Sequence, residues 1–238
     1  MLNKKTAIVT GCNGSLGTFF CKKLIEKNYS VIGLDLQKKS LQKDIIYKRL
    51  DISNFDQVKI FFKSLKKIDI LFNNAGIGVY TSCEKRTKTE IKKVVDTNLL
   101  GTLYVSLEAL KKMKNRKKGK IINIASIYGV VSSDKNIYGS SSRNNSEVYS
   151  ATKAAVIMLT KYLASYYADK NIQINCISPG GVFNFQEKNF VKNYSKKTPI
   201  GRMMKLNDFN AIFEFLISEN NNYFVGQNLI IDGGYSSI

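Results

Sequence analysis

Tyr149 and Lys153 are the two residues in this sequence whose types and spacing are best suited to proton transfer. They lie four residues apart near the start of a segment, 147–168, whose apolar pattern predicts a helix, so both side chains occupy one helical face. A free tyrosine phenol titrates near pH 10 and is a weak general acid or base at neutral pH. A neighbouring ammonium favours the phenolate and is expected to lower that pKa. The pair therefore indicates proton transfer on an alcohol or a ketone, although the same spacing also occurs on ordinary helix surfaces.

Two further polar residues stand where a substrate or the catalytic pair could use them. Ser126 directly follows a predicted strand, 121–125, and its hydroxyl could donate a hydrogen bond to a substrate carbonyl. Asn98 lies inside a long predicted helix, 89–115, where asparagine lowers helix propensity. We therefore expect Asn98 to have a role other than forming the helix.

A glycine-rich turn joins the first predicted strand, 6–10, to the first predicted helix, 16–27. Such a turn lets the backbone approach a pyrophosphate, and the helix N-terminus adds free N–H donors. The glycine spacing differs from G-x-G-x-x-G, so the turn taken alone is equally a tight connection. The candidate phosphate contacts are Gly11, Asn13, Gly14, Ser15, Leu16 and Gly17.

The end of the second predicted strand, 31–34, carries a candidate selector of the cofactor. Asp35, followed by Leu36, can accept hydrogen bonds from an adenosine ribose and would repel a 2′-phosphate. This favours NAD over NADP, although Lys38 and Lys39 lie close by and a capping role for Asp35 is also open.

Residues at the ends of two further predicted strands are also candidate ligand contacts. Asp51 and Ile52 follow the strand predicted over 45–50, where a carboxylate would meet the adenine. Asn74, Ala75 and Gly76 follow the strand predicted over 68–72. Ligands of open parallel sheets bind at the carboxyl ends of the strands, so these residues are candidate cofactor contacts.

Short apolar runs alternate with amphipathic segments over nearly the whole chain. Strands of this kind are buried on both faces, which predicts one doubly wound α/β domain, a three-layer sandwich over residues 1–238. The segment 132–146 is rich in serine and asparagine and is predicted to be a loop. Predicted strands are 6–10, 31–34, 45–50, 68–72, 121–125, 172–177 and 228–231, and predicted helices are 16–27, 55–66, 89–115, 147–168 and 207–218.

The amino-acid composition excludes several kinds of catalytic and metal site. The 238 residues include no histidine, which excludes a Ser-His-Asp triad and any His-ligated metal. The four cysteines, at 12, 21, 83 and 176, form no C-x-x-C pair, so we expect no metal site and a reducing, cytoplasmic location. No apolar run approaches the roughly 20 residues of a membrane span, and no apolar signal segment is expected.

The chain is strongly basic, with 37 Lys and Arg against 18 Asp and Glu, a net charge of +19. A basic surface can attract nucleic acid, an anionic membrane or an acidic carrier protein. Lysine supplies nearly all of the charge, and asparagine is abundant, which is also the composition of an AT-rich genome. We therefore expect no membrane partner and no nucleic-acid partner.

Taken together, these motifs resemble the short-chain dehydrogenase/reductase family of the single-domain type. The resemblance covers essentially the whole chain, in the expected order, and includes Asp232-Gly233-Gly234 near the C-terminus. It implies a seven-stranded Rossmann sheet, an NAD(P) cofactor and a homotetramer or dimer. It also implies a catalytic tetrad and a nicotinamide contact formed by Pro179, Gly180 and Val182.

In that implied tetrad each residue has its own role. Tyr149 exchanges the proton, Ser126 orients the carbonyl, Lys153 holds the ribose and tunes Tyr149, and Asn98 holds a relay water. Two positions depart from the family pattern: Ser15 stands where the middle glycine of the turn is usual, and Asn184 replaces a threonine near the carboxamide.

The largest departure is the long interval between Ser126 and Tyr149, which contains the segment 132–146. We expect this polar insertion to lie near the substrate, where a wall of hydroxyl and amide groups suits a polyhydroxylated or charged compound. A flexible surface insertion is an equally open interpretation. The stretches 123–131, 162–167 and 175–181 resemble more specifically a bacterial subgroup associated with surface-polysaccharide and flagellin sugar modification.

The sequence thus predicts an NAD(H)-dependent oxidoreductase that interconverts a hydroxyl and a keto group on a sugar-like small molecule. One alternative is a 3-oxoacyl-carrier-protein reductase, for which the basic surface would suit an acidic carrier. A second alternative is a non-catalytic dinucleotide-binding protein.

Overall fold

The computed structural model describes residues 4–141 and 143–238; Ser142 of the predicted insertion lies outside the described residues. The predicted apolar runs form a single seven-stranded parallel sheet in the order β3-β2-β1-β4-β5-β6-β7. The strands are β1 (Thr6–Thr10), β2 (Ser30–Asp35), β3 (Ile46–Arg49), β4 (Ile70–Asn73), β5 (Gly119–Ile124), β6 (Ile172–Pro179) and β7 (Asn228–Ile231). The helices are α1 (Ser15–Glu26), α2 (Phe55–Ser64), α3 (Lys88–Val95), α4 (Thr102–Arg116), α5 (Glu147–Tyr167), α6 (Lys188–Lys197) and α7 (Asn210–Ile217).

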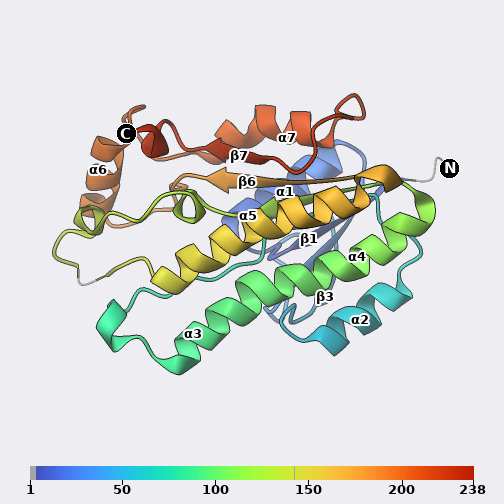
Figure 1. The fold of residues 1–238 in the computed structure, drawn as a ribbon, viewed down its shortest axis with the longest axis horizontal. Helices are drawn as coiled ribbons and strands as arrows, with labels where there is room; N and C mark the ends of the chain where they lie inside the picture. Colours follow the sequence, from blue (N-terminus) through green and yellow to red (C-terminus); the bar gives the residue numbers. More distant parts are fainter. Residues whose placement is uncertain (1–3, 142) are drawn as a thin grey trace.

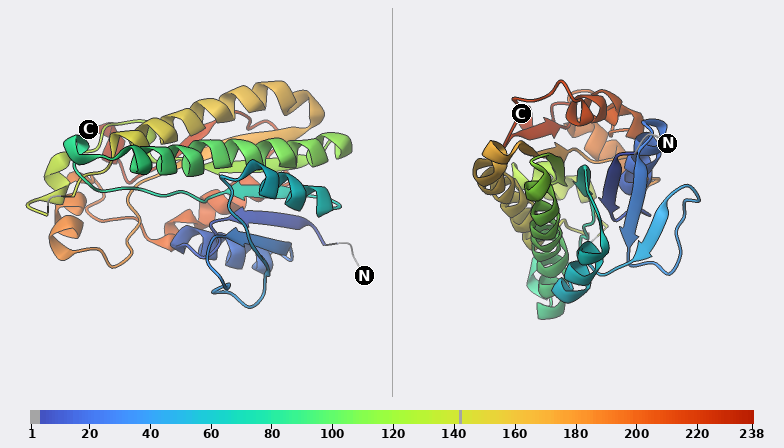
Figure 2. Two further views of the ribbon diagram at one scale, coloured as in Figure 1. Left: turned by 90° about the horizontal axis from the view of Figure 1, so that it is seen from below. Right: turned by 90° about the vertical axis from the view of Figure 1, so that its right-hand side faces the viewer.

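Helices cover both faces of the sheet (Figures 1 and 2). Helices α1 and α7 pack through phenylalanines such as Phe20 and Phe213 onto one face. Helices α2, α4 and α5 cover the other face through residues such as Phe62, Leu110 and Leu163. This arrangement confirms the predicted doubly wound, three-layer single domain.

The strand order reverses between β1 and β4, because successive strands extend the sheet first to one side of β1 and then to the other. Such a reversal opens a crevice at the carboxyl ends of the strands, where ligands of these folds bind. The candidate site lies at this edge.

One expectation about secondary structure is corrected, and one observed helix has no counterpart among the predicted ones. The helix predicted over 89–115 is interrupted by a π-helical segment, Asp96–Gly101, between α3 and α4. The apolar pattern does not predict helix α6, because lysines and asparagines leave it only a short apolar stripe of Phe190, Val191 and Tyr194.

A third apolar cluster lies apart from the two that flank the sheet. It contains Ile127, Ile137, Tyr138, Tyr194, Met203 and Tyr235. Helix α6 and the insertion 132–146 meet here, at the end of the molecule that also holds the C-terminus (Figure 1). We call it the mouth cluster.

Candidate active site

One cleft of about 570 Å³ opens at the carboxyl edge of β4, β5 and β6. Nine of the residues predicted from the sequence line it: Leu16, Asn74, Gly76, Ser126, Tyr149, Lys153, Pro179, Gly180 and Val182. The remaining candidates lie behind the lining or along the edge toward β2 and β3.

The glycine-rich turn is built for close backbone approach. Gly11 has φ +64°, a left-handed conformation that glycine adopts without steric cost. A Cβ on Gly17 would lie 2.0 Å from the Gly11 carbonyl oxygen, so only glycine fits there. Helix α1 begins after Gly14 with no side-chain cap, which leaves its first backbone N–H groups free for an anion. Ser15, the departure from the family pattern, contributes one of these amides.

Thr10, which no sequence motif marks, fixes the turn against the end of β4. Its hydroxyl accepts hydrogen bonds from the backbone N–H groups of Asn74 and Ala75, both at 3.0 Å. The Asn74 side-chain amide donates in turn to the carbonyls of Thr10 and Gly11. The two predicted cofactor segments are therefore held together by the side chains of Thr10 and Asn74, each bonded to the backbone of the other segment.

Asp35 stands at the carboxyl end of β2 and faces the same turn. Its carboxylate accepts hydrogen bonds from the backbone N–H of Asn13 at 3.0 Å and of Gln37 at 3.2 Å. The Asn13 side chain donates to Gln37 and to the carbonyl of Lys39, so the segment after β2 folds over the turn.

The candidates nearer β2 and β3, Asp51, Ile52 and Leu36, make local contacts or are exposed. The Asp51 carboxylate accepts hydrogen bonds from the N–H and the hydroxyl of Ser53, before α2. Ile52 is buried against Gly101, whereas Leu36 is exposed.

Asn98 is buried in the π-helical segment, behind the cleft. Its amide exchanges two hydrogen bonds with the backbone of Ile77, at 2.8 and 2.9 Å, and donates a third to Thr152 on α5 at 3.3 Å. Single turns of π-helix inside α-helices are frequent at functional sites. Asn98 thus joins the segment after β4 to the helix that carries Tyr149.

Lys153 reaches across the sheet edge from α5. Its ammonium donates to the Ile124 carbonyl at 2.7 Å and lies 5.6 Å from the centre of the Tyr149 ring. A Cβ on Gly76 would lie 3.3 Å from this ammonium and 3.4 Å from the side-chain oxygen Oδ1 of Asn98. Gly76 therefore leaves room where Lys153 and Asn98 converge.

Ser126 and Tyr149 both line the cleft and interact with each other. A hydrogen bond from the Ser126 hydroxyl lowers the pKa of Tyr149, but burial raises it more, to about 12. Burial lowers the pKa of Lys153 to about 8, because the interior disfavours an ammonium. The expected lowering of the Tyr149 pKa is therefore wrong for the chain's own residues: the cost of burying a phenolate exceeds the stabilisation that its neighbours provide.

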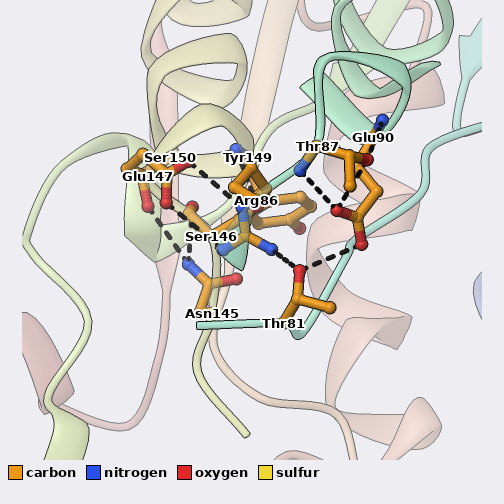
Figure 3. A network of polar contacts seen from close by, with 9 residues as sticks. All are labelled: Thr81, Arg86, Thr87, Glu90, Asn145, Ser146, Glu147, Tyr149 and Ser150. Carbon is orange, nitrogen blue, oxygen red and sulfur yellow. Dashed lines mark hydrogen bonds and ion pairs between the residues drawn. The ribbon is translucent and has the colours of Figure 1, made fainter. Parts of the chain in front are cut away.

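A polar network holds the first turn of α5, which carries Tyr149 (Figure 3). The helix begins after Ser146, whose hydroxyl accepts from the Tyr149 N–H at 3.1 Å. Arg86, with only 3% of its side chain exposed, makes two hydrogen bonds to the Glu147 carboxylate, each of 3.2 Å. Its third nitrogen donates to Thr81, which donates to Glu90 of α3. The segment 81–90 is thereby clamped to the catalytic helix.

The insertion 132–146 forms part of the cleft wall, with a composition different from the expected one. Ser141, Arg143 and Asn145 line the cleft together with a ring, Tyr138, which belongs to the mouth cluster. Ser132, Ser133 and Asn144 line a neighbouring hollow. Asp134 is directed to Lys197 of α6 at 2.8 Å, so this part of the insertion is an anchor and not a substrate wall.

Several other lining residues carry no sequence motif, among them Tyr80, Gln186, Glu187, Phe190 and Tyr194. They come from loops and from α6, where no strand end marks them. The i,i+4 spacing of Phe190 and Tyr194 was the available signal, and their rings lie 6.0 Å apart.

These residues fit a nicotinamide dinucleotide. The uncapped start of α1, the glycine cradle and the Asp35 carboxylate lie along the edge that leads into the cleft of Tyr149 and Lys153. Within residues 4–141 and 143–238, no three Cys, Asp or Glu side chains are grouped as metal ligands would be. No described helix combines the length and hydropathy needed to cross a bilayer.

A family model described as short chain dehydrogenase matches residues 5–195. The chain belongs to the short-chain dehydrogenase family. As a member of this family it is an oxidoreductase that acts on CH–OH groups with a nicotinamide dinucleotide, which confirms the resemblance drawn from the motifs.

Relatives of this short-chain dehydrogenase include the acetoacetyl-CoA reductase of Acinetobacter sp. (strain RA3849), 29% identical, with 98% of each chain covered. A 3-oxoacyl-(acyl-carrier-protein) reductase of Chlamydia pneumoniae is 30% identical, with 97% of this chain and 96% of the relative covered. Among solved structures, a short-chain dehydrogenase from Leptospira borgpetersenii serovar Hardjo-bovis (strain JB197) with bound NAD⁺ is 41% identical, with a TM-score of 0.91, covering 98% of this chain and 93% of that chain. ElxO with NADP bound is 28% identical, with a TM-score of 0.84, covering 99% of this chain and 100% of that chain.

Proposed function

We propose that this enzyme interconverts a hydroxyl and a keto group on a polar, sugar-like small molecule, with NAD(H) as its cofactor. The observation that carries the proposal is the convergence of Ser126, Tyr149 and Lys153 in one cleft. In ketone reduction, the Tyr149 hydroxyl donates its proton to the carbonyl oxygen while Ser126 holds that oxygen by a hydrogen bond. A bound reduced nicotinamide supplies the hydride to the carbonyl carbon.

The other two residues of the tetrad, Lys153 and Asn98, would support the cofactor and the proton transfer. The Lys153 ammonium would hold the nicotinamide ribose and assist the phenol, and Asn98 would support the proton path behind it. Pro179, Gly180 and Val182 would flank the nicotinamide, and the glycine-rich turn would hold the pyrophosphate.

The preference for NAD rests on Asp35. A carboxylate at the end of β2 would meet a 2′-phosphate with like charge, whereas it accepts hydrogen bonds from a free ribose. The bound NAD⁺ of the Leptospira structure is consistent with this preference, and the NADP of ElxO shows that both cofactors occur among structural neighbours.

A polar substrate is supported by the groups that the cleft offers. Ser141, Asn145 and Gln186 present hydroxyl and amide groups among the aromatic rings. The second candidate is reduction of a 3-oxoacyl thioester, which the names of the relatives and the +19 charge favour.

The deciding experiment measures NADH and NADPH oxidation against keto sugars, nucleotide-linked keto sugars and a 3-oxoacyl thioester. NADH-linked turnover of a sugar that is lost in Tyr149→Phe supports the proposal. NADPH-linked turnover of the thioester would establish the second candidate, and unchanged turnover in Tyr149→Phe would refute the proton-transfer role.

We also propose a homodimer or homotetramer and a location in the cytosol. Helix α5 exposes Met158, Tyr162 and Tyr166, with the two tyrosine rings stacked 4.6 Å apart, and such an apolar surface suits contact with a second copy. Sedimentation equilibrium of the wild type and of Tyr166→Glu tests the assembly. The buried free thiols of Cys12, Cys21 and Cys176 suit a reducing compartment.

A further inference from the structure

Arg143 occupies a distinctive position in the cleft. It lines the same cavity as Tyr149, and its guanidinium carbon lies 4.3 Å from the centre of the Tyr80 ring. Tyr80 extends in turn toward the catalytic tyrosine. A Cβ on Gly78 would lie 3.5 Å from the Tyr80 hydroxyl and 3.9 Å from Cδ2 of Tyr149. Arg143 therefore stands one aromatic ring away from the catalytic group.

Among the described residues, the Arg143 guanidinium has neither a carboxylate nor a carbonyl partner, whereas each of the other four arginines has one or the other. Arg86, Arg116 and Arg202 each pair with a carboxylate. Arg49 donates to the Leu36 carbonyl. No carboxylate of the described chain pairs with Arg143, which makes a stacking contact with a ring instead.

The carboxylate that lines the cleft does not supply that partner. Glu187 caps α6, where its side chain accepts hydrogen bonds from the N–H groups of Asn189 and Phe190. An arginine stacked on a ring keeps its in-plane donors available, and these match the two oxygens of a carboxylate or a phosphate.

Two contacts tie the chain around Arg143 and Tyr80 to the start of α5. The N–H of Asn144 donates to the Tyr80 carbonyl at 3.2 Å, which ties the insertion to the ring that Arg143 covers. The Arg86–Glu147 pair ties the segment following Tyr80 to the first turn of α5 (Figure 3). These contacts hold the backbone beside Arg143, and the segment that carries Tyr80, close to the first turn of α5, while the exposed Arg143 side chain rests on the Tyr80 ring.

We infer that the substrate carries an anionic group, a carboxylate or a phosphate, which Arg143 binds while the reacting carbon lies at Ser126 and Tyr149. This inference rests on the proposed function, because it assigns the substrate class of the same cleft. Arg143 is then the residue that determines specificity for a charged substrate.

The test compares keto compounds that differ in charge: acetoacetate with methyl acetoacetate, and dihydroxyacetone phosphate with dihydroxyacetone. The wild type should show a higher kcat/KM, with NADH, for the charged member of at least one pair. In Arg143→Gln the ratio of charged to uncharged kcat/KM should fall roughly 10- to 100-fold, the range of one charge-assisted hydrogen bond, mainly through KM. The pair with the larger fall distinguishes carboxylate from phosphate. Lys135→Gln, which removes an exposed charge from the same insertion but no cleft contact, should keep the wild-type ratio.

Binding separates this inference from the proposed function. Calorimetry of the NAD⁺ complex with each keto probe measures affinity where no hydride is available. Charged probes should bind more tightly than uncharged ones in the wild type, and Arg143→Gln should remove the difference. Equal binding of both members, binding of neither, or a preference that survives in Arg143→Gln overturns the inference. If charge-dependent binding is found without any NADH-linked turnover, the proposed reaction fails and the anion site stands.

Discussion

Replacing Lys153 by methionine should change how the stability of the protein depends on pH. The folded pKa of Lys153 is lowered from 10.5 to about 8 by burial, and only 4% of the residue is exposed. The unfolded chain therefore binds more protons at this site than the folded chain between pH 8 and 10.5, so its contribution to stability rises with pH in that window. The full difference corresponds to about 3 kcal/mol, and about 1.4 kcal/mol of it should be gained by pH 9.

The assay is urea unfolding followed by circular dichroism at pH 7, 8 and 9. Between pH 7 and 9 the wild type should gain about 1.4 kcal/mol relative to Lys153→Met, or roughly 3–5 °C in Tm for a domain of this size. Other groups that titrate in this range are common to both proteins, so their effects largely cancel in the difference. Lys192→Met removes an exposed ammonium and should give a curve parallel to the wild type. If Lys153→Met also runs parallel to the wild type, burial does not lower the pKa of Lys153 and the reasoning is refuted.

Three further perturbations test other parts of the site. The first concerns pH: because the pKa of Tyr149 is raised to about 12, the rate of ketone reduction should be nearly constant from pH 6 to 8. The logarithm of the alcohol oxidation rate should instead rise with pH with a slope near one. A plateau in the oxidation rate below pH 8 would contradict that pKa. Arg86→Met should lower kcat about tenfold with little change in the Kd of NADH, because it releases the first turn of α5 but removes no cofactor contact. Arg86→Lys should recover only part of the lost kcat. A change in the Kd of NADH without a change in kcat would contradict the positioning role. Gly17→Ala should weaken NADH binding at least tenfold and lower the free energy of unfolding by about 2 kcal/mol, because the added Cβ would overlap the Gly11 carbonyl oxygen. Wild-type NADH affinity in a fluorescence titration would refute the close packing of the turn against α1.

The strands are the part of the fold that the sequence predicts best. Buried parallel strands appear as uninterrupted apolar runs, and the last of them, Asn228–Ile231, is predicted with its observed bounds. The π-helical segment around Asn98 could not be predicted, because the insertion of one residue into a helix leaves the apolar pattern nearly intact. The only sign of it was the cost in propensity of an asparagine inside a helix.

The site was predictable where strand ends bring residues together and not where loops do. Ser126, Gly76 and Pro179 lie at the ends of adjacent strands, so their meeting at one edge follows from the topology. Tyr80 and Tyr138 reach the cleft from irregular segments, and their positions depend on packing between residues far apart in the sequence. The raised pKa of Tyr149 could not be predicted from the motif either, because it depends on burial, which spacing along a helix does not reveal.

The mouth cluster gives the substrate end of this enzyme an evolutionary freedom that the cofactor end lacks. Its rings and aliphatic side chains, among them Tyr138, Tyr194 and Met203, pack mainly on one another, apart from the two clusters that flank the sheet. Substitutions more than about 7–10 Å apart that share no partner have nearly independent effects on stability. Residues that select the substrate can therefore be exchanged by mutation while the sheet and the glycine-rich turn retain their packing, so new specificities can arise on an unchanged redox scaffold.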